Sequence, residues 1–167
     1  MDFEYKVLLE WRLDIKPLLM YGKELQLVDE LKYLGITLTS GKSFSFSTLP
    51  MLRKFRCATN TIINAHLKSS EPVLLKLIYA VAVPLLTYAC ESLSFTSKQM
   101  NEMTIALNDA IRRIFTYQRW ESITFLRQSF GYLSFTEIVQ RRTRNFMQFM
   151  ARTNNRTLMT LESITKG

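Results

Sequence analysis

Residues 47–65 read STLPMLRKFRCATNTIINA, and within them the periodicity of the sequence changes. Upstream, apolar and polar residues tend to alternate, whereas from this point apolar residues recur every three or four positions, as in an amphipathic helix. Ser47 or Thr48 is expected to cap this helix, with Pro50 in its first turn. The expected core face carries Leu52, Phe55, Thr59, Ile62 and Ile63, and the opposite face carries Arg53, Arg56, Asn60 and Asn64.

The residues before this stretch predict short strands. Residues 3–9 alternate, and residues 18–27 predict a hairpin that turns at Gly22. Residues 31–38 form one more alternating run, and Gly35 in its middle predicts a bulge or a close backbone approach. The polar, serine-rich residues 39–47 predict a loop.

The residues after the stretch predict helices. An apolar helix is expected over residues 73–89 with a kink at Pro84, then one from an N-cap at Ser97 to about Tyr117. A short helix over residues 122–130 should end at Gly131, and a last helix should start at Ser134 with Glu137 completing a capping box. Its core stripe would contain Phe135, Ile138, Val139, Phe146, Phe149 and Met150.

The predicted fold is therefore α+β and mostly α. It consists of a short antiparallel sheet remnant at the N-terminus and a bundle of about five helices. The expected parts are residues 1–40 with the strands, residues 41–152 with the helices, and a polar tail over residues 153–167.

Positive charge is concentrated toward the C-terminus. The chain of 167 residues has a net charge of +8, but residues 1–103 carry 12 basic and 10 acidic side chains, against 10 and 4 in residues 104–167. Arginine dominates the second part, and its planar fork suits phosphate or carboxylate. Nucleic-acid contact and a solvated basic face both explain this charge.

Two further arginine stripes follow from helical spacing. One contains Arg112, Thr116 and Arg119, beside an expected i,i+4 ion pair of Asp109 with Arg113. The other lies on the last helix, opposite its apolar stripe, and contains Arg141, Arg144, Asn145, Gln148 and Arg152.

The sequence contains no recognisable catalytic or metal-binding motif. His66 is the only histidine, Cys57 and Cys90 are expected to be reduced core thiols, and no phosphate-binding loop or zinc-protease string occurs. No catalytic residue and no metal ligand is predicted. The most apolar stretch, residues 77–90, is too short for a bilayer span of about 20 residues, so we expect a buried helix and no membrane partner.

Two motifs resemble a known family. Residues 22–36, GKELQLVDELKYLGI, resemble the stretch just after the polymerase core of reverse transcriptases of non-LTR (LINE-type) retrotransposons. Residues 77–91, LIYAVAVPLLTYACE, resemble a downstream helix of the same family with the pattern lYxxvxPxLlYgxexw. Ala89 stands where that family usually has glycine, and the tryptophan after Glu91 is missing. The resemblance covers roughly residues 18–149.

The resemblance implies a role in holding nucleic acid. Tyr33, Leu34 and Gly35 would fall at the primer grip, and Arg53, Arg56 and Asn60 on the first thumb helix. The stripes add Arg112, Arg141, Arg144 and Arg152 as expected nucleic-acid contacts. The implied partner is an RNA/DNA template–primer duplex, with the missing polymerase core as an additional candidate partner, and the implied location is intracellular, nuclear or cytoplasmic.

The same resemblance implies that this chain does not polymerise by itself. The family's paired aspartates lie upstream of the Tyr-Leu-Gly strand, and no Asp-Asp pair occurs here, so the ligands of the two Mg²⁺ ions are absent and no cofactor is expected. The chain would be a fragment of an RNA-directed DNA polymerase with latent template–primer affinity.

Two alternatives stay open at this point, and the oligomeric state is undetermined. One is a protein-interaction module that uses apolar surface uncovered by loss of the palm, on the N-terminal strands and around Pro84. The other is a retroelement remnant without a function.

Overall fold

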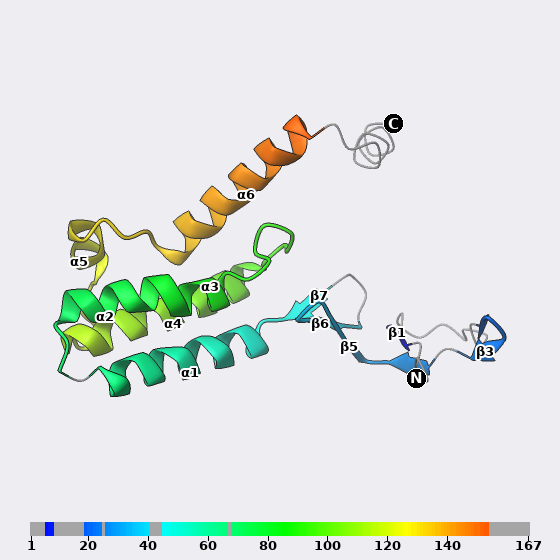
Figure 1. Cartoon of the computed structure of the whole chain (residues 1–167), viewed down its shortest axis with the longest axis horizontal. Helices are drawn as coiled ribbons and strands as arrows, with labels where there is room; N and C mark the ends of the chain where they lie inside the picture. The colour runs from blue at the N-terminus through cyan, green and yellow to red at the C-terminus, as the bar shows by residue number, and fades with distance from the viewer. Residues whose placement is uncertain (1–5, 9–18, 25, 41–44, 67, 154–167) are drawn as a thin grey trace. The chain divides into compact units, whose positions relative to one another are not determined.

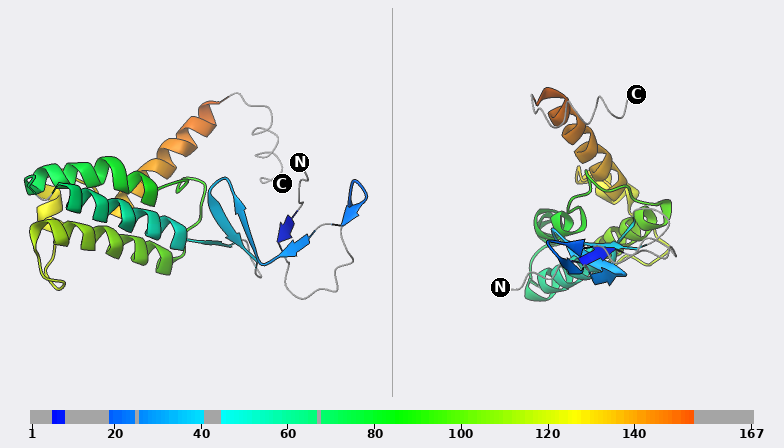
Figure 2. Two further views of the ribbon diagram at one scale, coloured as in Figure 1. Left: turned by 60° about the horizontal axis from the view of Figure 1, so that its bottom comes forward. Right: turned by 90° about the vertical axis from the view of Figure 1, so that its right-hand side faces the viewer.

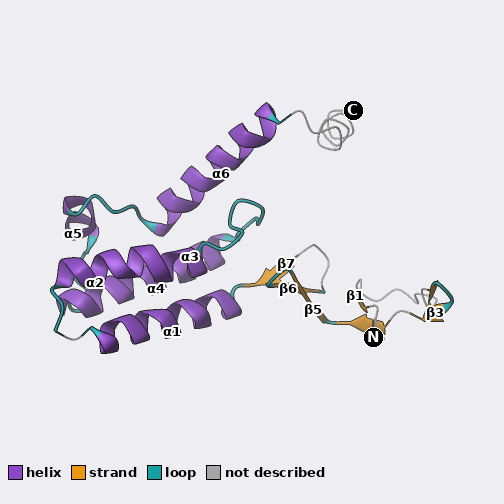
Figure 3. Ribbon diagram, viewed as in Figure 1, coloured by secondary structure: helices purple, strands orange, loops and turns teal. Residues whose placement is uncertain are grey.

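A computed structural model describes residues 6–8, 19–24, 26–40, 45–66 and 68–153. The chain forms two compact units, Met1–Arg53 with the strands and Lys54–Gly167 with most of the helices, and each is described by itself (Figure 1). The prediction of a mostly helical α+β chain is confirmed: a small antiparallel sheet precedes five helices in the described residues (Figure 3).

The first unit contains two small strand pairs. β2 (Leu19–Met20) and β3 (Lys23–Glu24) form the predicted hairpin, and both turn residues, Tyr21 and Gly22, have positive φ values of 51° and 76°. This is the backbone of a tight two-residue hairpin turn. β1 (Lys6–Leu8) pairs with β4 (Gln26–Val28) in parallel, so the strand region is not purely antiparallel.

A second hairpin replaces the single strand predicted over residues 31–38. β5 (Glu30–Tyr33) and β6 (Ile36–Thr39) are antiparallel, and Leu34 and Gly35 form the turn with φ values of 46° and 82°. The bulge expected at Gly35 is therefore wrong. Because the turn consists of two residues, apolar and polar residues keep alternating through it. The sequence therefore shows no break where the chain reverses direction.

The prediction of a loop over residues 39–47 is also wrong for its last three residues, which form a strand. β7 (Ser45–Ser47) pairs with β6, and Thr39 and Ser45 share a hydrogen bond of 2.7 Å between their hydroxyls. Phe46 is buried at 6% exposure. The short edge strand β7 is thus stabilised by one buried apolar side chain, Phe46, and by a cross-strand hydroxyl pair.

Three long helices lie side by side in the views of Figures 1 and 2. The first is α1 (Leu49–Ala65), which starts after Thr48 as predicted and buries Phe55, Thr59 and Ile62. The second consists of α2 (Glu71–Leu77), the π-helix η1 (Ile78–Ala82) and α3 (Val83–Leu86). The third is α4 (Ser97–Phe115), which buries the predicted Met103, Leu107, Ile111 and Ile114.

The π-helix explains how an apolar helix accommodates Pro84. Proline donates no backbone hydrogen bond, and its ring collides with the carbonyl four residues earlier. Here the N–H of Val83 reaches back five residues to the carbonyl of Ile78, which widens the turn before the proline. The predicted distortion at Pro84 is thus a π-turn, and the helix ends at Leu86 instead of residue 89.

Ala89 has a left-handed backbone. Its φ is 54°, within a turn closed by hydrogen bonds from Cys90 N–H to Thr87 O (3.2 Å) and from Ser92 N–H to Ala89 O (3.0 Å). A side chain with a Cβ is strained in this region, which favours glycine.

The remaining helices begin and end close to the predicted residues. α4 is capped by Thr96, one residue before the expected Ser97, in a capping box with Gln99. α5 (Thr124–Ser129) is followed by Gly131 at φ 71°. α6 (Phe135–Arg152) has the predicted capping box of Ser134 and Glu137, and the Ser134 hydroxyl is the main reason that the pKa of Glu137 is lowered.

The predicted core stripe of α6 is only partly correct. Phe135 is fully buried and meets Phe95 edge to face, but Phe149 is 63% exposed. The helix leaves the other helices after its first turns (Figures 1 and 2). Periodicity identified the apolar face correctly but could not indicate whether another element covers it.

Arg142 lies in the middle of that apolar stripe and anchors α6. Its guanidinium donates to the hydroxyl of Thr87 (2.8 Å) and to the carboxylate of Glu91 (3.3 Å). Burial raises the pKa of Glu91, but hydrogen bonds from its own N–H and from Cys90, together with Arg142, outweigh burial, so the pKa is lowered overall.

None of the helices in the described part of the chain has the length and apolar character that a bilayer span requires.

Replacing Ala89 with glycine should stabilise the protein. The left-handed conformation costs a residue with a Cβ about 1–2 kcal/mol. Glycine avoids this cost, but its greater conformational freedom in the unfolded chain reduces the net gain in stability. We expect Ala89→Gly to raise the free energy of unfolding by roughly 1 kcal/mol in urea titrations. Ala80→Gly, on the exposed side of η1, is the matched control and should lower it by roughly 1 kcal/mol. A loss of stability in Ala89→Gly contradicts the assignment.

The Arg142–Glu91 pair should make stability depend on acid pH. Because the folded pKa of Glu91 is lowered, its contribution is present above the ordinary glutamate value and is lost as pH falls through the folded pKa. The difference in unfolding free energy between wild type and Glu91→Gln should therefore shrink between pH 6 and pH 3. Glu102→Gln, which removes a carboxylate on α4 without a described ion pair, is the control. A difference that stays constant over this range contradicts the role of the pair.

Candidate nucleic-acid interface

A hollow lies between α1 and α4 in the second unit, and we call it the α1–α4 pocket. Its volume is about 180 Å³. Ala106 and Ala110, one turn apart on α4, have small side chains that leave this space between the helices open. The polar side chains around it come from both helices, and the full lining is Phe55, Arg56, Thr59, Asn60, Ala106, Asp109, Ala110 and Arg113.

Arg113 links the two helices across this pocket. Its guanidinium donates to the side-chain carbonyl oxygen of Asn60 at 2.6 Å. Asp109 does not pair with Arg113, as the sequence had predicted, but with Arg112 at 3.0 Å. The i,i+4 prediction is wrong because Asn60 on the neighbouring helix offers Arg113 a tertiary partner. Thr59 is 2% exposed, and its hydroxyl has no hydrogen-bond partner among the described residues.

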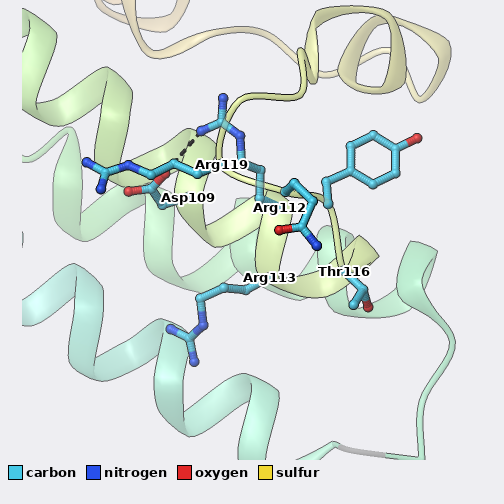
Figure 4. A pocket seen from close by; sticks show the side chains of 7 residues that line it. Asp109, Arg112, Arg113, Thr116 and Arg119 are labelled. Atoms are coloured by element: carbon cyan, nitrogen blue, oxygen red, sulfur yellow. Dashed lines mark hydrogen bonds and ion pairs between the residues drawn. The ribbon is translucent and has the colours of Figure 1, made fainter.

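A larger hollow of about 510 Å³ lies at the C-terminal end of α4, and we call it the α4 end pocket (Figure 4). It shares Asp109 and Arg113 with the α1–α4 pocket. The two hollows therefore form one continuous surface. The lining of the end pocket is Asp109, Arg112, Arg113, Thr116, Tyr117, Gln118 and Arg119.

The chain is turned sharply at the end of α4 to form this pocket. Thr116 adopts the left-handed conformation (φ 56°, ψ 30°), and the N–H of Tyr117 closes the helix on the carbonyl of Arg112 at 2.9 Å. Arg112 then holds the chain that follows, because its Nε and one terminal nitrogen both donate to the backbone carbonyl of Glu121 at 3.2 Å. Among the described residues, Arg112 thus donates hydrogen bonds to Asp109 and Glu121 of its own chain.

The electrostatic field of this surface is positive. Four arginines, Arg56, Arg112, Arg113 and Arg119, surround the two hollows, against the carboxylate of Asp109. Arg112 compensates Asp109, and Glu121 engages its carboxylate with the N–H of Gln118. Arg56 and Arg119 are exposed and make no ion pair or side-chain hydrogen bond with another described residue, which leaves their donors available to a ligand.

The structure brings some of the predicted contact residues together. Arg56 and Asn60 of α1 line the α1–α4 pocket, and Arg112 of α4 lines the adjoining α4 end pocket. Arg53 is exposed on α1, but it belongs to the first unit and lines neither pocket.

The other predicted contact residues lie elsewhere. Arg141, Arg144 and Arg152 are exposed on α6, outside both pockets. Tyr33, Leu34 and Gly35 form the tip of the β5–β6 hairpin in the first unit, where Tyr33 is 61% and Leu34 71% exposed.

Sequence reasoning missed two residues of this surface. Arg113 was assigned to an ion pair within its own helix, and Arg119 was noted on a helical face although the helix ends before it, at Phe115. The sequence has no clear signal for the turn that carries Arg119, because residues 116–121, TYQRWE, contain no glycine, proline, asparagine or aspartate.

The cysteines and acidic residues give no sign of a metal site. Within the described ranges, no group of three His, Cys, Asp or Glu side chains is close enough to hold a metal ion. Cys90 is a buried thiol, as predicted, and burial together with its hydrogen bond to Glu91 raises its pKa to about 12. Cys57 is exposed on α1, so the prediction of a core thiol is wrong for that residue.

Comparison with protein families, with curated proteins and with solved structures finds no match to this chain. The fold and the surface define its class: a mostly helical α+β protein with an arginine-lined surface beside the middle of α1 and at the C-terminal end of α4.

Proposed function

We propose that this protein binds nucleic acid through the joined α1–α4 and α4 end pockets. The observation that carries the proposal is that Arg56 of α1 and Arg119 of the turn after α4 line two adjoining hollows that share Arg113 of α4. Like charges repel, so placing guanidiniums from three separate elements along one surface costs free energy. A polyanion that contacts all three offsets this repulsion.

The donor set suits a sugar–phosphate backbone. Guanidinium groups bind phosphate oxygens through two parallel N–H donors, and amide and hydroxyl groups such as those of Asn60 and Thr59 suit sugar hydroxyls. No array of side chains here is arranged to distinguish one base pair from another. Binding is therefore expected to follow the backbone, to be largely independent of sequence and to weaken strongly with salt.

We further propose that the chain is the C-terminal part, primer-grip strand and thumb, of a non-LTR retrotransposon reverse transcriptase. Two backbone observations support the resemblance stated above. Ala89 has a left-handed backbone at the position where the family has glycine, and Gly35 of the Tyr-Leu-Gly motif forms a tight turn with φ 82°. Each motif therefore contains a position with the left-handed backbone that glycine adopts most easily. Glycine occupies this position in the first motif, and alanine occupies it in the second.

On this proposal the natural ligand is the RNA/DNA template–primer duplex. The polymerase core, with its paired carboxylates and Mg²⁺ ions, is then the expected protein partner, and the location is nuclear or cytoplasmic. This chain contributes binding and positioning of the duplex, and catalysis belongs to the core.

Removing two free arginines should weaken binding in a salt-dependent way. Arg56→Ala combined with Arg119→Ala removes two cations that make no described internal contact, so folding should be preserved. We expect weaker binding to an RNA–DNA hybrid at 50 mM salt. The slope of log affinity against log salt should fall in magnitude by about 2, one for each lost phosphate contact. Fluorescence anisotropy of a labelled hybrid measures both quantities.

The matched control is Lys76→Ala combined with Lys98→Ala. It removes the same charge from exposed positions on α2 and α4, and Lys98 lies about 22 Å along α4 from Arg113 at 1.5 Å per residue. Equal losses in the two double variants would mean that net charge alone governs binding. No detectable affinity of the wild type at 50 mM salt contradicts the proposed function itself.

A further inference from the structure

The four residues Gln118–Glu121 form a tight turn beside the α4 end pocket. The N–H of Glu121 donates to the carbonyl of Gln118 at 3.1 Å, and the N–H of Gln118 donates to the Glu121 carboxylate. Arg112 fixes the turn to α4 with two hydrogen bonds of 3.2 Å to the Glu121 carbonyl. The central residues, Arg119 and Trp120, are therefore presented at the tip of a turn that is held in place from both sides.

Aromatic side chains stand next to the arginines of this turn. Trp120 is 84% exposed at the tip, and Tyr117, 39% exposed, lines the pocket itself. Phe115, at the last turn of α4, meets the ring of Tyr117 edge to face with ring centroids 6.4 Å apart. An indole exposed to this extent contributes little to the core, so its position at a fixed turn is not explained by packing.

Rings and guanidiniums together select for unpaired nucleotides. In a duplex the base faces are already stacked on each other, so a flat side chain gains nothing from them. In a single strand the faces are free and stack on aromatic rings, while cations follow the phosphates. The volume of about 510 Å³ lies within the range of small-ligand sites, roughly 300–1,000 Å³.

We propose that the α4 end pocket and the 118–121 turn bind an unpaired nucleic-acid strand. Arg113 and Arg119 contact its phosphates, and Tyr117 and Trp120 stack on its bases. Arg112 is a positioning residue, because its donors are engaged with Asp109 and Glu121. The inference rests on the proposed function and adds to it a second form of ligand: an unpaired strand that uses Arg113 and Arg119 and also stacks on the two rings.

Tryptophan fluorescence tests this inference directly. The chain has two tryptophans, Trp11 and Trp120, so Trp11→Phe leaves Trp120 as the only indole reporter. Titration with a ten-nucleotide oligo(dT), the same length of oligo(U) and a blunt RNA–DNA hybrid separates the ligands. We expect either single strand to quench Trp120, and the blunt hybrid to bind without comparable quenching.

Substitutions at Trp120 separate stacking from simple apolar contact. Trp120→Leu keeps an apolar side chain but loses the ring, and single-strand affinity should fall about tenfold, within the range measured for one lost base stack. Trp120→Phe keeps a ring and should retain most of the affinity. Hybrid affinity should change less than twofold in either variant, because the hybrid needs only the arginines.

The outcomes distinguish this inference from the proposed function. If the hybrid binds but neither single strand quenches Trp120, or if Trp120→Leu weakens hybrid and single strand equally, the single-strand site is refuted and duplex binding stands. If neither hybrid nor single strand binds at 50 mM salt, the proposed function fails as well. A preference for oligo(U) or for oligo(dT), with quenching, supports the site.

Discussion

The double hydrogen bond from Arg112 to the carbonyl of Glu121 is the contact on which the surface depends. It joins the last turn of α4 to the chain that follows it, while the ion pair with Asp109 holds the guanidinium itself in place. Together with the left-handed turn at Thr116, this link fixes the chain that carries Arg119 beside the end of α4. With it, residues from two helices and a turn share one surface.

The core supplies the free energy that keeps like charges close. Phe55 on α1 and Leu107 and Ile111 on α4 are almost fully buried, and each buried side chain of this size contributes roughly 1.5–3 kcal/mol. Repulsion between exposed guanidiniums is screened by water and salt and is smaller than this. The packing of α1 against α4 therefore determines where the arginines stand, and the arginines determine what the surface attracts.

Much of the fold could be predicted from sequence because local signals specify it. The caps at Ser134 and Gly131, the proline at position 50 and the apolar spacing of α4 mark helices that the structure contains. The hairpin at Leu34 was missed because a two-residue turn preserves alternation, and β7 was missed because it contains one apolar residue between serines.

The site was less predictable because it is made by tertiary contacts. Spacing placed Arg56 and Asn60 on one face of α1, but no local pattern shows that Arg113 of α4 reaches Asn60. Likewise, Arg142 interrupts an apolar stripe, and only the positions of Thr87 and Glu91 explain it. Helical periodicity gives the direction of a side chain, whereas the identity of its partner comes from the packing of elements distant in sequence.

The central claim is that the joined pockets are the surface that meets nucleic acid. Arginine Nε–Hε signals in ¹H–¹⁵N spectra of this 19.6 kDa chain report on each guanidinium during titration with an RNA–DNA hybrid. The account predicts that the largest shifts occur at Arg56, Arg113 and Arg119, while the backbone amide of Lys98 at the other end of α4 is unchanged. Formation of a saturated complex without shifts at these three arginines would contradict it.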